Sequence, residues 1–343
     1  MILTDSLLIG DEAVLPGERK TVHLRVSALY DFTEITVPVE VIRGEQPGPT
    51  LFIAAAVHGD EINGVEIIRR LIQRPVLKRL RGTLLAVPIV NVFGFNNKSR
   101  YLPDRRDLNR SFPGSRRGSL ASRLAHVFMQ EVVLKSDYGL DLHTGAVHRY
   151  NLPQIRVSLD DPRAVRLAKA FAVPVIMNSD LRDGSLRSAA HRKGIPILVY
   201  EGGEALRFNE SVIRAGVRGC ISVMQEIQML PQTVTNKSAV EGKDHATFIA
   251  RDSRWVRAPR SGAYTPLKSL GDRILEGEVL AVIADPLGKE ECEVISPEKG
   301  IIVGASRIPL VNQGDAMFHV ATFKNNKKVR RMLERYENEY SDE

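Results

Sequence analysis

The spacing of hydrophobic and polar residues changes twice along the chain. Residues 1–47 alternate between polar and apolar positions, as at 21–26 and 34–41, which predicts antiparallel strands joined to the region that follows. From 48 to 230, short apolar runs alternate with segments of helical spacing, which predicts a doubly wound α/β sheet. From 246 to 323, short strands separated by glycine turns predict a smaller all-β domain.

The central region is predicted to alternate strands and helices around one long loop. Strands are expected at 50–57, 82–90, 140–143, 154–159, 173–177 and 195–200. Helices are expected at 61–73, 119–134, 162–172, 185–193 and 210–230, with Asn209 as the cap of the last one. The loop at 91–117 is too long and too rich in arginine for a simple connection, so we expect it to be functional.

The C-terminal part divides into three predicted segments. A polar linker at 231–245 precedes the β domain at 246–323, and a charged tail follows at 324–343. Segments 274–283 and 296–302 look like the barrel-sandwich fold of lipoyl-type domains. The lysine that carries the cofactor of such domains has no counterpart at a hairpin tip, so a carrier role is not expected.

The stretch at 51–66 combines a buried strand with polar chemistry at its end. An apolar run leads into His58, Gly59, Asp60 and Glu61, and apolar residues then return at helical spacing. Open parallel sheets bind ligands at the carboxyl ends of their strands, which is where His58 and Glu61 are placed. Residues three apart at the start of a helix can converge on one point, and both residue types are zinc ligands.

A third zinc ligand is predicted at another strand end, within Asp141-Leu142-His143-Thr144-Gly145. Two histidines and one glutamate with one open position form the ligand set of a catalytic zinc rather than a structural one. A shared ion requires the imidazoles of His58 and His143 to lie within about 5 Å of each other. Asp141 is expected either to accept a hydrogen bond from a ligand histidine or to be a strand-end turn residue.

Composition and charge exclude several classes of protein. The chain has 343 residues, 43% hydrophobic and 26% charged, which is typical of a globular protein with two domains. Apolar runs fall short of the ~20 residues of a membrane span, and the N-terminus lacks a secretory pattern. Cys220 and Cys292 are expected to be packing residues, which favours a cytoplasmic location. The net charge of +7 comes without a nucleic-acid-binding motif, so we expect neither nucleic acid nor membrane as partner.

One group of basic residues in the loop at 91–117 is denser than the rest. It is either a solvated basic surface or a funnel for a small anionic substrate. Its position between two predicted ligands favours the funnel. The group comprises Arg100, Arg105, Arg106, Arg110, Arg116 and Arg117.

The order of the motifs resembles that of the succinylglutamate desuccinylase/aspartoacylase family, a branch of the zinc carboxypeptidase fold. Asp107-Leu108-Asn109-Arg110 lies between the ligand motifs and Tyr200-Glu201-Gly202-Gly203 follows them, so the resemblance covers about residues 45–230. It implies a mixed sheet of the zinc carboxypeptidase type, one zinc per subunit, and hydrolysis of the amide bond of an N-acyl amino acid. It leaves the acyl group and the amino acid open.

Glu201 is the predicted general base. It ends a buried strand, where we expect its carboxylate to lack partners and its pKa to be raised by burial. The family places its catalytic glutamate at a similar position after a strand. Glu204, in the same loop, is the competing candidate.

The resemblance also implies roles for residues of the arginine-rich loop. Asn109 and Arg110 resemble the family's pair for the substrate carboxylate, which arginine can grip through two parallel hydrogen bonds. Arg100 resembles the arginine that polarises the scissile carbonyl. Arg105 is its rival, because the loop departs in length from the family pattern.

Two further residues complete the predicted site. Asp107 is expected to orient Arg110, and Arg187 is expected to meet a second charge of the substrate. The remaining histidines are not expected to be ligands, because they lie on helices, in loops or in β-rich parts away from the motifs. They are His23, His126, His148, His191, His245 and His319.

Two other functions fit the same residues. A metallocarboxypeptidase acting on peptides or protein tails would use the same zinc, Asn-Arg pair and glutamate, but would cleave blocked dipeptides that a deacylase spares. A non-catalytic zinc-binding assembly protein would keep the ligands without the chemistry. Strand edges in the β-rich flanks favour a homo-oligomer.

Overall fold

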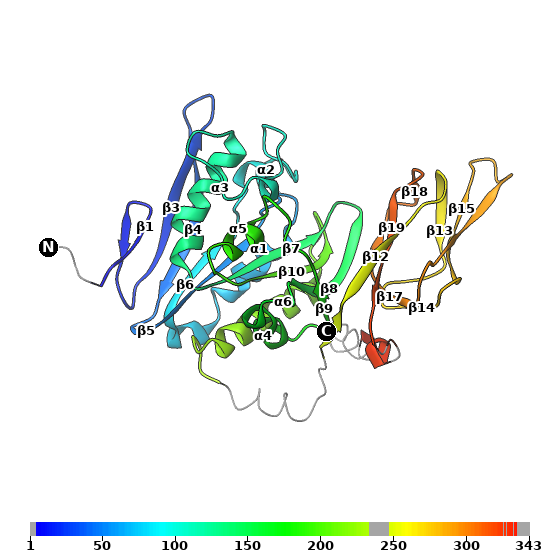
Figure 1. The fold of residues 1–343 in the computed structure, drawn as a ribbon. Coiled ribbons are helices and arrows are strands. Elements are labelled where there is room, and N and C mark those ends of the chain that lie inside the picture. Colours follow the sequence, from blue (N-terminus) through cyan, green and yellow to red (C-terminus); the bar gives the residue numbers. More distant parts are fainter. Residues whose placement is uncertain (1–4, 233–246, 325, 327, 332, 335–343) are drawn as a thin grey trace.

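A mixed β-sheet organises the computed structural model, which describes residues 5–232, 247–324, 326, 328–331, 333 and 334 (Figure 1). Within these residues the sheet has 13 strands. The main path of hydrogen-bonded neighbours is β12 (Asp252–Arg257), β19 (Ala316–Thr322), β17 (Gly300–Ser306), β8 (Arg149–Val157), β10 (Ile197–Glu204), β7 (Tyr138–Gly145), β5 (Gln46–Ala55), β6 (Arg81–Val87), β4 (Glu34–Arg43) and β3 (Arg19–Ala28).

The centre of this sheet is parallel and its two sides are antiparallel. Strand β5 pairs in parallel with β6 and β7, and β7 pairs in parallel with β10. The predicted N-terminal hairpin, β3 with β4, joins antiparallel to β6, and β8 joins antiparallel to β10. The parallel strands are apolar over most of their length because both of their faces are covered.

Helices pack on both faces of the sheet, as the alternating pattern predicted. One face carries α1 (Asn63–Leu71), α4 (Pro162–Phe171) and α6 (Glu210–Glu226), which share a core cluster with the strands. The other face carries α3 (Leu120–Glu131) and α5 (Leu186–His191) in a second cluster. This arrangement confirms a mixed α/β fold with one large sheet.

Asn209 precedes α6, as predicted, but its side chain does not cap the helix. Its oxygen accepts hydrogen bonds from the side-chain amide of Asn63 at 3.2 Å and from the backbone N–H of Glu204 at 3.3 Å. Asn209 therefore links the start of α1 to the end of β10. The helix ends at Glu226, before the predicted end at 230.

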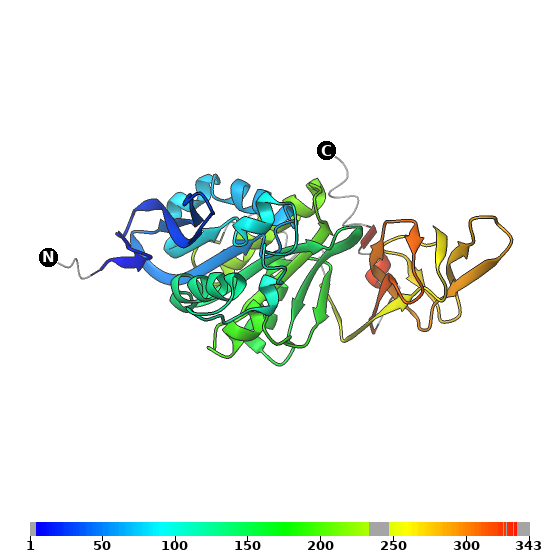
Figure 2. The same cartoon turned by 90° about the horizontal axis from the view of Figure 1, so that it is seen from above.

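From 247 to 324 the described elements are strands, as predicted, but some of these strands are hydrogen-bonded to the central sheet. Strand β17 pairs antiparallel with the first half of β8, with Gly304 opposite Asn151. Strand β11 (Phe248–Ala250) pairs in parallel with β9 (Val175–Asn178), which itself lies beside the second half of β8. Figure 2 shows these strands continuing beyond the end of the central sheet. A second sheet contains β16 (Glu291–Ile295), β15 (Val279–Ala284), β13 (Gly262–Pro266) and β18 (Leu310–Val311).

Several shorter elements complete the described chain. They are β1 (Leu7–Ile9), β2 (Glu12–Val14), η1 (Pro75–Arg79), α2 (Val92–Asn96), η2 (Leu108–Arg110), η3 (Val133–Lys135) and β14 (Arg273–Ile274). Most of the predicted linker, 233–245, lies outside the described residues, as do 325, 327, 332 and 335–343 of the predicted tail. Among the described residues, no helix has the length and apolar character that crossing a membrane requires. Cys220 is buried in α6, Cys292 is half-buried on β16, and both are free thiols.

Candidate metal centre and pocket

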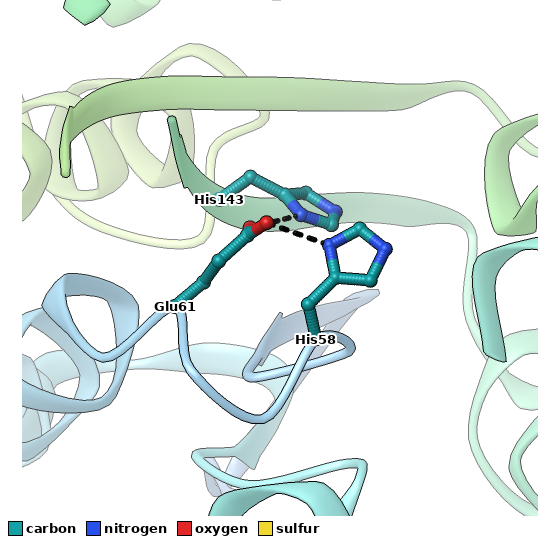
Figure 3. Close-up of side chains that lie close together, drawn as sticks. All are labelled: His58, Glu61 and His143. Carbon is teal, nitrogen blue, oxygen red and sulfur yellow. Dashed lines mark hydrogen bonds and ion pairs between the residues drawn. The ribbon is translucent and has the colours of Figure 1, made fainter. Parts of the chain in front are cut away.

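The three predicted ligands come from two neighbouring parallel strands. Strand β5 ends at Ala55, the turn between β5 and α1 carries His58 and Glu61, and His143 lies on β7. In the ladder between these strands Ala55 is opposite Leu142, so both strands deliver their ligands at the same edge of the sheet (Figure 3). The ligands are 2–5% exposed, so bulk water barely reaches them.

Close backbone packing fixes the turn that carries His58 and Glu61. A Cβ at Gly59 would lie 1.9 Å from the backbone carbonyl carbon of Gly94, so only glycine fits there. Asn91 caps α2 by accepting a hydrogen bond from the N–H of Gly94 at 2.9 Å, which holds the opposing loop in place. The arginine-rich loop and the ligand turn are therefore positioned by each other.

The donor atoms of the three side chains converge on one point. Oε1 of Glu61 is 2.7 Å from Nδ1 of His58, and Oε2 of Glu61 is 2.7 Å from Nδ1 of His143. One ligand atom from each residue lies within 4.8 Å of the other two, and the imidazole centroids are 4.9 Å apart. The separation meets the limit of about 5 Å for a shared ion, so the three residues could hold a metal.

Burial and mutual attraction set the charges of this group. Burial opposes ionisation of Glu61, but the charges of His58 and His143 outweigh it and hold the pKa of the Glu61 carboxyl well below its usual range. Burial likewise opposes protonation of His143, yet Asp141 and Glu61 raise its pKa well above the ordinary value. A metal ion would replace the proton on each Nδ1, because metals bind neutral imidazole nitrogen.

Each histidine has an aspartate behind it. Oδ2 of Asp141 is 2.9 Å from Nε2 of His143, which matches the first of its two predicted roles. Oδ1 of Asp107 is 3.2 Å from Nε2 of His58, a contact that the sequence did not predict. Carboxylates in this position hold one ring nitrogen and turn the other toward a metal.

The structure corrects the predicted role of Asp107. Its carboxylate accepts hydrogen bonds from Nη2 and Nε of Arg100 at 3.0 and 3.2 Å, and from the backbone N–H of Asn109 at 2.8 Å. The Arg110 side chain donates instead to the carbonyl of Asn109, at 2.5 Å. The Asp107 side chain thus orients Arg100 and His58 rather than Arg110.

The two rival arginines occupy different places. Nη1 of Arg100 is 3.3 Å from Oε1 of Glu61 and 3.2 Å from Nδ1 of His58, so its guanidinium contacts two of the three candidate ligands. Arg105 is exposed, has a backbone φ of +61°, and does not line the pocket described below. Of the two, only Arg100 faces the three ligands.

Glu201 has two partners, contrary to the prediction that it lacks them. Asn151 donates a hydrogen bond to Oε2 of Glu201 at 2.7 Å, and Nε of Arg156 is 2.9 Å from Oε1. The competing candidate, Glu204, accepts a hydrogen bond from the backbone N–H of His148 at 3.1 Å and lies outside the pocket lining.

Arg187 reaches the pocket from α5. Its Nη2 donates to the carbonyl and hydroxyl of Ser179 at 3.0 and 3.1 Å and to the carbonyl of Asp180 at 2.6 Å. Its Nη1 is buried and has no hydrogen-bond partner within the described residues. Burial and the charge of Arg156 lower the pKa of Arg187 to about 10, so the guanidinium stays charged at neutral pH.

A cavity of about 260 Å³ joins these groups. Apart from the rival candidates Arg105 and Glu204, its lining includes the residues that the sequence predicted for metal binding, substrate binding or catalysis: His58, Glu61, Arg100, Asn109, Arg110, His143, Arg187 and Glu201. Sequence analysis missed Arg149, Arg156, Arg182 and Trp255, which also line it. Arg156 interrupts the buried part of β8 and offered a signal, whereas Arg149 begins that strand and Trp255 lies far from every motif. A larger open groove, of about 1410 Å³, contains none of these residues.

The other described histidines do not belong to the group formed by the three candidate ligands. Among the described residues, His58, Glu61 and His143 form a group of three potential ligands close enough to share a metal ion. His319 is buried on β19, and His245 lies outside the described residues.

Known proteins resemble the chain in both sequence and structure. The sequence model of one protein family, the succinylglutamate desuccinylase/aspartoacylase catalytic domain, matches residues 47–227. An N-alpha-acetyl-L-2,4-diaminobutyric acid deacetylase of Halomonas elongata is 29% identical over 299 residues, which cover 84% of this chain and 86% of that protein.

Solved structures share the fold over nearly the whole chain. A succinylglutamate desuccinylase/aspartoacylase from Rhodobacter sphaeroides has a TM-score of 0.80 and 28% identity, covering 90% of this chain and 96% of the other. The product-bound ectoine utilization protein EutE (DoeB) from Ruegeria pomeroyi has a TM-score of 0.79 and 22% identity, covering 90% and 97%. The second likeness is one of fold alone.

Proposed function

The chain belongs to the succinylglutamate desuccinylase/aspartoacylase family, and from that premise we propose that it is a zinc-dependent hydrolase of the amide bond of a small N-acyl amino acid. The family acts on N-acyl amino acids, and the chain has a group of ligands that fits a metal. The observation that carries the proposal is the single cavity shared by those ligands, a carboxylate and several arginines.

The chemistry of the donor set favours zinc, at one ion per subunit. Two imidazole nitrogens and one carboxylate are its common catalytic ligands, and Asp107 and Asp141 fix the orientation of the imidazoles. When bound, zinc supplies Lewis acidity, which activates water and polarises a carbonyl.

Glu201 is the proposed general base and acid. Its carboxylate takes a proton from the attacking water and passes it to the nitrogen of the leaving amine, so that the amide yields a carboxylate and a free amine. Asn151 and Arg156 hold the carboxylate in one orientation. Arg100, which touches the metal centre, is positioned to stabilise the negative charge that develops on the carbonyl oxygen.

The remaining arginines favour an anionic substrate. Asn109 and Arg110 are the proposed partners of the substrate's α-carboxylate. Arg187 offers a buried, charged and unpartnered Nη1 to a second acceptor. The cavity of about 260 Å³ suits a small molecule better than a peptide chain, which favours the deacylase over the carboxypeptidase. A cytoplasmic location and a homo-oligomer remain predictions.

Metal analysis followed by a substrate panel tests the proposal. The purified protein should contain about one zinc per chain, hydrolyse N-acetyl or N-succinyl amino acids, and lose that activity to a chelator until zinc is restored. Blocked dipeptides should remain intact. Cleavage of the dipeptides in preference to the N-acyl amino acids would identify a carboxypeptidase. A zinc-loaded protein inert toward both sets would be a non-catalytic binding protein.

A further inference from the structure

Trp255 brings the C-terminal β region into the pocket. It lies on β12, yet it lines the same cavity as His58, His143 and Glu201. The other apolar side chains of that lining, Ala146 and Val199, are small. Trp255 is therefore the one large aromatic surface among the described residues of the pocket.

A parallel stack holds the Trp255 ring in place. Its ring and that of His319 have centroids 4.7 Å apart and an interplanar angle of 6°, and the two residues are opposite each other on β12 and β19. Burial, together with the charge of Arg156, lowers the pKa of His319 to about 3, so this imidazole is neutral at physiological pH. A buried neutral ring behind the indole gives it a rigid support.

Backbone packing connects the stacked rings of Trp255 and His319 to Glu201, the predicted general base. Gly304 on β17 lies opposite both Asn151 on β8 and His319 on β19. A Cβ at Gly304 would lie 2.7 Å from the Asn151 side-chain oxygen and 3.3 Å from Cβ of His319. The missing side chain thus lets His319 approach Asn151, which holds Glu201. The C-terminal strands cannot shift without disturbing this side of the pocket.

Arg149 lies on the indole and keeps its charge free. Its guanidinium carbon is 5.3 Å from the centroid of the Trp255 ring, within the range of a cation–π contact. Arg149 lines the cavity, and among the described residues no carboxylate forms an ion pair with it. A guanidinium over an aromatic face keeps N–H groups free to donate, and two of them can match a carboxylate.

We propose that Arg149 and Trp255 form a carboxylate-recognition surface, through which the C-terminal β region takes part in substrate selection. This role rests on the proposed function for the identity of the cavity as the substrate site. Arg149 contributes the charge, and Trp255, stacked on His319, supplies the aromatic face over which the guanidinium lies. The surface receives a carboxylate of the substrate at the wall built by β8 and β12.

The single tryptophan of the chain makes a direct binding experiment possible. Tryptophan fluorescence is followed while succinate is added to the full-length protein, and succinamide, its uncharged analogue, is added in a parallel titration. Succinate should change the emission of Trp255 saturably, and succinamide should not. In Arg149→Gln the apparent affinity for succinate should fall at least about tenfold, the loss expected for a charge-assisted contact.

Arg254→Gln is the matched control. Arg254 precedes Trp255 on the same strand, is exposed and does not line the cavity, so its loss removes one positive charge without touching the proposed surface. Its succinate affinity should stay within about twofold of the wild type, since Arg254 lies outside the cavity lining and its exposed charge is screened by salt. Equal losses of succinate affinity in both variants would mean that the total positive charge, and not Arg149 itself, determines binding. That result would overturn the proposal.

The remaining outcomes are decisive as well. An equal response to succinate and succinamide, or an unchanged succinate affinity in Arg149→Gln, overturns the proposal. If that variant does not fold, the wild-type comparison of succinate with succinamide still tests it. The titration needs no turnover, so it tests the carboxylate-recognition surface separately from the proposed hydrolase function. It can be carried out with metal-loaded and with chelated protein. If Trp255 fluorescence responds to succinate but not to succinamide in a protein without deacylase activity, the proposed function is contradicted and the recognition surface is not.

Discussion

His143 and Glu201 are register partners on the adjacent parallel strands β7 and β10. Directly opposed residues of a parallel pair leave the same face of the sheet, so the ladder itself places the carboxylate beside the ligand imidazole. The same ladder sets Asp141 opposite Val199, one step back on the same face. This register is strongly specified, because a shift of β10 by one residue along β7 would point the Glu201 side chain to the opposite face of the sheet.

Replacing Glu201 by Gln should abolish most of the activity and leave the metal in place. The amide keeps the size of the side chain but cannot carry the proton, so kcat should fall by about 10²–10⁴-fold. Steady-state kinetics and zinc content are measured together. Glu204→Gln is the control, because Glu204 lies outside the cavity and should keep nearly full activity. The opposite ranking would assign the base role to Glu204.

Arg100→Gln and Arg105→Gln distinguish the two arginines of the long loop. Loss of the guanidinium that touches the metal centre should lower kcat/KM by about 10²–10³-fold, the usual effect of removing a donor to a developing oxyanion. Arg105 is exposed and should tolerate the change. Kinetics on one N-acyl amino acid decide the question. Comparable losses in both variants would mean that the loop moves during the reaction.

Asp141→Asn should weaken zinc binding without removing a ligand. The asparagine cannot offer a negative charge to Nε2 of His143, and losses of such contacts typically cost about 10–100-fold in metal affinity. Competition with a chromophoric chelator measures the affinity. Asp160→Asn, an exposed substitution on the same domain, is the control. Unchanged zinc affinity in Asp141→Asn would leave Asp141 as a strand-end turn residue.

A pH-dependent contribution to stability is expected from the ion pairs between α1 and α6. Arg70 donates to Glu66 at 2.7 Å and to Glu210 at 2.6 and 2.8 Å. Hydrogen bonds from Arg69 and Arg70 lower the pKa of Glu66 to about 2 from its ordinary 4.5. The folded pKa lies below the unfolded one, so the stabilisation is full above pH 4.5 and is lost as the pH falls toward 2.

Arg70→Gln should accordingly lower the free energy of unfolding by about 0.5–1 kcal/mol near neutral pH, the range for partly exposed ion pairs. Denaturant unfolding at several pH values should show this difference shrinking below pH 4.5. Arg69→Gln is the comparison, because Arg69 contacts Glu66 but does not reach α6. A difference that grows on acidification would contradict the linkage.

The grouping of the three candidate metal ligands was predictable from sequence because short-range rules place them. His58 and Glu61 follow a buried strand and precede a helix, and His143 ends another strand, so the carboxyl edge of a parallel sheet brings them together. The general fold was predictable for the same reason, since periodicity alone distinguishes strands from helices here.

The supporting contacts depend on pairings between distant segments that periodicity does not report. The bond from Asp107 to His58 depends on the path of a long loop, and the partners of Glu201 come from β8, which folds back antiparallel. The join between β17 and β8 likewise brings Trp255 to the cavity from a region that the sequence presented as a separate domain.

That join limits how the chain can be shortened. The family match ends at residue 227, which invites truncation near 230. Such a fragment would lose β17 and β11, the hydrogen-bonding neighbours of β8 and β9. Unpaired backbone N–H and C=O groups would then lie beside the pocket, and unpaired strand edges of this kind pair with other chains. A fragment that ends near 230 is therefore expected to aggregate, because the strands that shield this edge from other molecules would be missing.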